Sequence, residues 1–84
     1  MPGNKNPNKS AKILDPRILK IAERLKELRQ KKGYTSSETF ANQFDLSRVH
    51  YWRLEKGSNL TIDSLLKIID IHDIKLKDFF EGIE

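Results

Sequence analysis

The spacing of the apolar residues constrains the fold of this chain most strongly. Between Ile18 and Leu28 they recur at intervals of three and four residues, the repeat of a helix with one buried face. No segment shows the alternation of apolar and polar residues that is typical of a strand. A chain of 84 residues has room for one small hydrophobic core. The sequence therefore predicts a single all-α domain.

Capping residues indicate where the first two helices begin. Asp15 before Pro16 is typical of a helix start, because Asp accepts amide hydrogen bonds and Pro has no amide hydrogen to satisfy. Gly33, after two lysines, predicts the end of this helix. Thr35 and Glu38 form the pattern of a capping box, which predicts a second helix from Thr35 to about residue 44.

Similar signals predict three further helices. Ser47 can cap a third helix that ends at about residue 56, before Gly57. Thr61 can cap a fourth, and a short fifth helix is expected over residues 76–83. The buried face of the fourth helix is predicted to comprise Ile62, Leu65, Leu66 and Ile69.

The two ends of the chain differ in composition and charge. Residues 1–12 are rich in Asn, Pro, Gly and Lys, which predicts a disordered basic arm before a folded domain over residues 13–84. Residues 13–57 carry ten basic and six acidic side chains, whereas residues 58–84 carry three and six. The basic surplus suits a polyanion partner, but an ordinary charge fluctuation explains it equally well.

Several classes of protein are not expected from this sequence. There is no cysteine, and no apolar run approaches the roughly 20 residues that span a bilayer. His50 and His72 fall on different predicted helices, and there is no glycine-rich phosphate loop or metal-binding pair of histidines. We therefore expect a soluble cytoplasmic protein without membrane contact, catalytic activity, cofactor or metal.

The predicted third helix has two chemically different faces. Tyr51 and Leu54, with Ser47 at the start, lie on one side at 100° per residue and suit the core. The opposite side suits a DNA groove, since Arg can bind guanine with two hydrogen bonds and Val can contact a thymine methyl. Trp52 can pack on the second helix or stack along the DNA backbone. The residues of this opposite side are Arg48, Val49, Trp52, Arg53 and Lys56.

From Ile21 to Phe80 the chain resembles the phage-repressor-like (Cro/C1, XRE) helix-turn-helix family. The similarity is carried by landmarks in the family's order and at its spacing. They are Arg29 four residues before Gly33, Phe40-Ala41, Leu46-Ser47-Arg48 and Leu54-Glu55-Lys56-Gly57. The resemblance implies a five-helix lambda-repressor-like DNA-binding domain with a helix-turn-helix. The third helix, residues 47–56, would read the major groove.

The resemblance also implies roles for individual residues. Base contacts are expected from Arg48, Val49 and Arg53, with Trp52 and His50 beside them. Ser37 stands where the family usually has a Gln that binds a phosphate. A partly buried, structural salt bridge between Arg29 and Glu55 is also implied. Beside these, the further phosphate contacts that we expect are Lys32, Lys56, Ser58 and Asn59.

Two other positions depart from the family's pattern. Asp73 stands where the family prefers Gly, and His72 stands where it prefers an apolar residue. We expect His72 to be a partly buried histidine of the core or its rim, without a functional role.

The expected partner is double-stranded DNA, bound by a transcriptional regulator such as a repressor. One module this small would bind weakly, so we expect a homodimer on a near-palindromic site. Its interface is predicted at Phe79, Phe80 and Ile83, unless these side chains only close the bundle over the first helix. An antitoxin with a toxin partner, a controller of restriction–modification genes and a protein-binding module without DNA activity remain alternatives.

Overall fold

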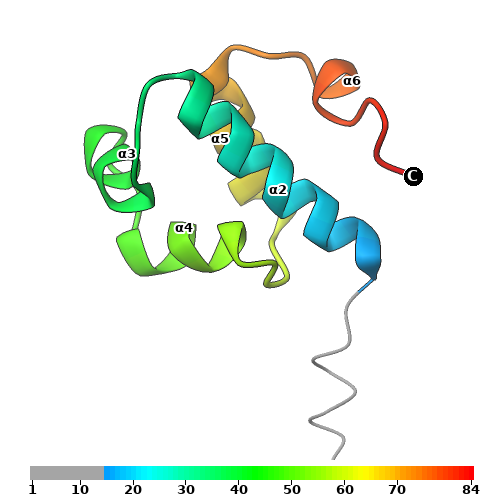
Figure 1. Cartoon of the computed structure of the whole chain (residues 1–84), viewed down its shortest axis with the longest axis horizontal. Helices are drawn as coiled ribbons and strands as arrows, with labels where there is room; N and C mark the ends of the chain where they lie inside the picture. Colours follow the sequence, from blue (N-terminus) through cyan, green and yellow to red (C-terminus); the bar gives the residue numbers. More distant parts are fainter. Residues whose placement is uncertain (1–14) are drawn as a thin grey trace, which may run out of the picture.

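The computed structural model describes residues 15–84, and the predicted arm over residues 1–12 lies outside them. The described residues form helices joined by short turns, with no strand, which confirms the all-α prediction (Figure 1). No helix of this part of the chain is long and apolar enough to cross a bilayer. The helices are α2 (Pro16–Lys31), α3 (Ser37–Gln43), α4 (Arg48–Glu55), α5 (Ile62–His72) and α6 (Leu76–Phe79).

One core is built from all five of these helices. Phe40 lies at its centre, with its ring centroid 5.0 Å from that of Tyr51 and 4.9 Å from that of Phe44. Packing of aromatic rings at this distance adds to the stability gained by removing them from water. The buried apolar side chains come from α2, α3, α4, α5 and α6, and include Leu25, Phe40, Tyr51, Leu54, Leu65, Ile69 and Phe79.

Side-chain caps begin α2, α3, α4 and α5, and one of them differs from the prediction. Ser47 and Thr61 accept hydrogen bonds from the amides of residues 50 and 64, as predicted. The cap of α3 is Ser36, whose Oγ accepts from the Thr39 amide at 3.1 Å. The prediction of a Thr35–Glu38 box was therefore wrong by one residue. Thr35, Ser36 and Ser37 are all competent caps, so the choice depends on burying Phe40 and Ala41 rather than on local chemistry.

Four successive helices end with the same backbone geometry. Gly33, Asp45, Gly57 and Asp73 all have positive φ, between 53° and 99°. Each donates its amide to the carbonyl three residues back, and the next amide donates to the carbonyl five residues back. This arrangement satisfies helix carbonyls and favours glycine, which has no Cβ to oppose the left-handed conformation. The chain therefore holds two aspartates at glycine positions.

Asp45→Gly and Asp73→Gly are each expected to raise the free energy of unfolding by about 0.5–1 kcal/mol, because glycine relieves the left-handed strain. Urea denaturation of each variant measures this effect. Gly33→Ala is the matched control, since a Cβ at Gly33 meets no atom within 4 Å and adds only conformational strain. The free energy of unfolding of Gly33→Ala should be lower than that of the parent by about 1 kcal/mol. Aspartate variants no more stable than the parent would show that the carboxylates compensate for the strain.

The C-terminal third differs from the prediction in two places. Ile68 is buried on α5, whereas Ile62 is 68% exposed and Leu66 is also exposed, so these two residues were wrongly assigned to the core. The buried face of α5 is rotated toward Ile68 because the neighbouring helices cover only that side. Helix α6 ends at Phe79 and not near Ile83, since the chain turns at Gly82 with φ of 84°.

Candidate nucleic-acid interface

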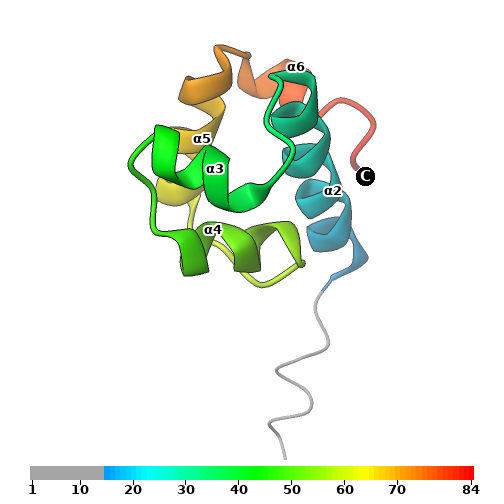
Figure 2. The same ribbon diagram turned by 60° about the vertical axis from the view of Figure 1, so that its left-hand side comes forward.

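The helix-turn-helix corner is formed by α3 and α4. Figure 2 shows α3 above α4, with α2 and α5 on either side, and α4 at one edge of the bundle. The turn is held by the Leu46 amide, which donates to the Ala41 carbonyl at 2.8 Å. Tyr51 and Leu54 are buried beneath α4 and anchor it to the core, as its two-faced pattern indicated. The other face of α4 is therefore directed outward.

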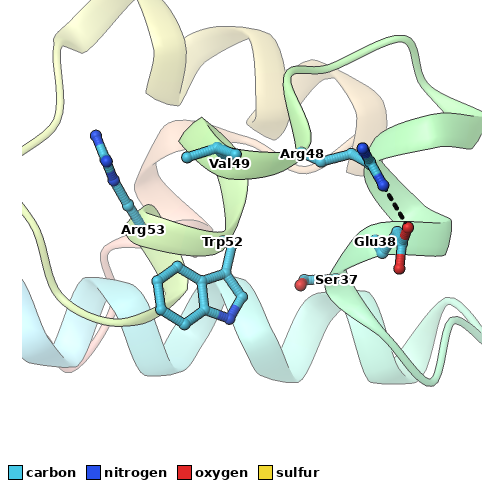
Figure 3. A pocket seen from close by; sticks show the side chains of 6 residues that line it. All are labelled: Ser37, Glu38, Arg48, Val49, Trp52 and Arg53. Atoms are coloured by element: carbon cyan, nitrogen blue, oxygen red, sulfur yellow. Dashed lines mark hydrogen bonds and ion pairs between the residues drawn. The ribbon is translucent and has the colours of Figure 1, made fainter.

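An open hollow of about 430 Å³ lies on this outward side (Figure 3). Val49 and Trp52 are 59% and 50% exposed, so neither side chain is buried in the core of the bundle. The hollow combines an apolar surface with cations and a hydroxyl. These are the groups that contact thymine methyls, base edges and phosphates. Its lining residues are Ser37, Glu38, Arg48, Val49, Trp52 and Arg53.

The charged groups around the hollow are not equivalent. Arg48 donates through Nη1 to Glu38 Oε2 at 2.5 Å, whereas Arg53 forms no ion pair within residues 15–84. Lys56 Nζ lies 5.3 Å from the centroid of the Trp52 ring, a cation–π contact that places an ammonium beside the hollow. Sequence reasoning assigned Glu38 to a capping box and did not detect its contact with Arg48. Only the packing of α3 on α4 brings them together.

Arg29 and Glu55 connect α2 to the end of α4. Arg29 donates from Nε and Nη2 to the two Glu55 oxygens at 2.8 and 2.9 Å, and the side chains are only 5% and 6% exposed. Arg29 Nη1 also donates to the Tyr34 carbonyl at 2.9 Å. The bond to Glu55 raises the pKa of Arg29 further above its already high value. This pair has the geometry that the family resemblance implied, and it supports α4 from behind.

Most of the other candidate DNA contacts lie away from the hollow. His50 Nε2 is 3.3 Å from Ser64 Oγ of α5, on a different side of α4. Ser58 Oγ donates to the Arg53 carbonyl at 3.0 Å, and Asn59 Oδ1 accepts from the Leu60 amide, so both complete the backbone turn after α4. Lys32 Nζ lies 5.7 Å from the ring of Phe44, which ends α3, whereas Ser37 begins that helix. Of these candidates only Ser37 lines the hollow with Arg48 and Arg53, whereas Lys32, His50, Ser58 and Asn59 do not.

The C-terminal residues close the bundle. Phe79 is fully buried in its own core, so its proposed place in a dimer interface is not compatible with this fold. Arg24 donates to the Phe79 carbonyl, and to that of Glu81 at 3.0 Å, which fastens the segment to α2. Phe80 and Ile83 are partly buried and line a shallow hollow with Ile18 and Ile21 of α2. The alternative that these side chains close the bundle over the first helix therefore describes all three of them.

His72 is part of the core rim. Its ring stacks on Phe40 with centroids 5.3 Å apart and planes 7° from parallel, and its Nε2 is buried without a hydrogen-bond partner in the described part of the chain. Burial, and then the charge of Lys32, lowers the pKa of His72 below its ordinary value of 6.5. The imidazole is therefore held neutral, because its protonated form would be a buried, unpaired charge.

Stability should consequently fall when the solution is acidified. The unfolded chain binds a proton at His72 more readily than the folded chain does, so the contribution of His72 is complete above pH 6.5 and is lost below it. Urea midpoints measured between about pH 7.5 and pH 5 should decrease for the parent and be nearly constant for His72→Leu. Equal pH dependence in the two proteins would assign the effect to other groups.

The comparisons with known proteins agree with this architecture. A helix-turn-helix family model matches residues 25–79, which include α3, α4 and α5. The control protein C.MunI of a Mycoplasma species is 37% identical over 67 residues, which cover 79% of this chain and 90% of the relative. No solved structure matches the chain closely enough to be counted as similar.

The chain belongs to the phage-repressor-like helix-turn-helix family. It is a DNA-binding regulator of transcription, and its partner is double-stranded DNA.

Proposed function

We propose that α4 enters the major groove and reads bases through Arg48, Val49, Trp52 and Arg53. The observation that carries this proposal is the half-exposed pair of Val49 and Trp52 in an open hollow flanked by cations. Leaving a valine and a tryptophan in water lowers stability, and a thymine methyl or a deoxyribose is a suitable partner for them. The chain acts by binding alone, without a catalytic step.

Phosphate contacts in this proposal come from the edges of the hollow. Ser37 supplies a hydroxyl from the first turn of α3, and Lys56 supplies an ammonium at the end of α4. Arginines read bases with two parallel donors, whereas a lysine acts on phosphates as a point charge. Lys32, His50, Ser58 and Asn59 contribute less, since none of them lines the hollow or, like Lys56, contacts a residue that lines it from its outward side.

Selection of bound duplexes from a random pool tests the proposal. We expect one enriched, near-palindromic sequence, and an affinity that falls linearly on a double-logarithmic plot against salt concentration. Failure to enrich any sequence, together with no binding at low ionic strength, would contradict it. The expected site of action is the cytoplasm, where the duplex partner is found.

The similarity to a control protein favours one regulatory setting. The alignment with the relative named control protein C.MunI covers most of this chain. We propose that this chain likewise regulates restriction–modification genes by binding their promoter DNA. A neighbouring restriction gene would support this setting, whereas a neighbouring toxin gene would indicate an antitoxin that has a protein partner as well.

A homodimer would double the small footprint of one module on DNA. With Phe79 buried, we place its interface on α5, where Ile62 and Leu66 are exposed one helical turn apart. A second copy is the occupant that we propose, because a two-fold axis brings the same apolar pair together from both chains. Half-sites would then lie about one turn of DNA apart, roughly 34 Å.

Ile62→Glu should weaken dimerisation about 10-fold or more, because two buried carboxylates would face each other across the axis. Sedimentation or light scattering over a range of concentrations measures the change from twice 9.8 kDa to one chain mass. Leu76→Glu is the matched control, since Leu76 is similarly exposed but lies on α6. A parent with a monomer mass at every concentration would contradict the dimer, and an unaffected Ile62→Glu dimer would contradict this interface.

A further inference from the structure

We propose that Glu38 is a positioning residue, which orients the Arg48 guanidinium for the recognition of one guanine. The inference rests on the proposed function of α4 and adds a specificity determinant from α3. It begins from the one acidic side chain among the six that line the hollow. An acid here is unexpected, because a carboxylate facing DNA is repelled by every phosphate.

The geometry of the ion pair leaves the reading edge of Arg48 available. Glu38 Oε2 accepts from Nη1 alone, and Nε and Nη2 of Arg48 form no hydrogen bond with any residue from 15 to 84. These two nitrogens carry the parallel donors that can bind O6 and N7 of guanine. The side chains are 59% and 60% exposed, so a base edge can approach while the ion pair persists.

The two partners are held by different helices. Glu38 lies in the first turn of α3, and Arg48 is the first residue of α4. In Figure 3 they point toward each other at one end of the hollow, whereas Arg53 extends alone at the other end. The aromatic packing of Phe40 on Tyr51 fixes α3 against α4, and so fixes where the carboxylate can hold the guanidinium.

Restraint of Arg48 has a consequence for specificity. A free arginine loses rotamer freedom when it binds a base, whereas one already held by a carboxylate loses less. A guanidinium held by a carboxylate also cannot change rotamer to donate to a neighbouring base or phosphate in place of guanine. Arg48 should therefore discriminate more strictly than it would alone, at the cost of weaker attraction to DNA in general.

The test is a double-mutant cycle on the selected duplex, with Glu38→Ala and Arg48→Ala alone and combined. The base pair read by Arg48 is identified as the one whose discrimination Arg48→Ala abolishes. Discrimination is the ratio of the Kd for a substituted site to the Kd for the selected site. Glu38→Ala should lower this ratio about two- to five-fold at that base pair. The ratio at the base pair read by Arg53 should be unchanged, and Glu38→Gln should fall between parent and alanine variant.

Controls separate positioning from net charge. Asp63→Ala removes an exposed acid that is paired with Lys67 on α5, away from the hollow, and should leave every ratio unchanged. In the Arg48→Ala background, Glu38→Ala should no longer alter any ratio. An unchanged ratio in Glu38→Ala, or a loss that persists without Arg48, would overturn the inference. A base pair that depends on Arg48 but not on Glu38 would leave the proposed function intact, whereas a parent without any sequence preference would refute that function itself.

Discussion

Glu55→Ala is expected to lower the free energy of unfolding by about 3–5 kcal/mol, because it leaves a buried guanidinium without its carboxylate. Arg29 is almost fully enclosed, and Glu55 accepts two of its three side-chain hydrogen bonds. Domains of this size are stabilised by only about 5–15 kcal/mol, so the variant should be close to unfolding at room temperature. Urea denaturation followed by circular dichroism measures the loss.

Two comparisons show whether burial causes this effect. Glu38→Ala removes the acid of an exposed ion pair and should cost less than about 1 kcal/mol. Arg29→Met combined with Glu55→Met removes both charges and should recover most of the stability lost in Glu55→Ala, since methionines can fill the space without burying a charge. If Glu55→Ala were no more damaging than Glu38→Ala, the Arg29 guanidinium would be solvated in the folded chain.

Arg53→Ala should reduce discrimination at one base pair of the selected site by about 1–3 kcal/mol, or roughly 5- to 150-fold in relative affinity. Arg53 is exposed and forms no ion pair with any described residue, so thermal stability should be unchanged. Competition binding with singly substituted duplexes measures the effect.

Lys56→Ala is the matched control on the same helix face. It should weaken binding to all duplexes alike and reduce the salt slope by about one, as expected for a phosphate contact. If the Arg53→Ala protein bound every duplex as the parent does, α4 would not be the recognition helix.

The division of α4 into two faces was predictable because it is a local property. Ser47 and Leu54 are seven positions apart, and at 100° per residue the order of the residues alone places Tyr51 and Leu54 opposite Trp52 and Arg53. The caps at Ser47 and Thr61 were predictable for the same reason, since a cap bonds to an amide three residues away. The failure at Thr35 shows the limit, because three neighbouring hydroxyl residues offered equivalent local chemistry.

The amino-acid order by itself therefore determined the all-α fold class, most helix ends and the residue types on the outward face of α4, since each depends on contacts within a few residues. Tertiary structure decided which side of α5 is buried, that Phe79 packs in its own core, and that His50 lies toward Ser64. It also brought Glu38 to Arg48, ten positions along the chain. The reason is physical: these features depend on how one helix is placed against another, and periodicity within a single helix carries no information about that placement.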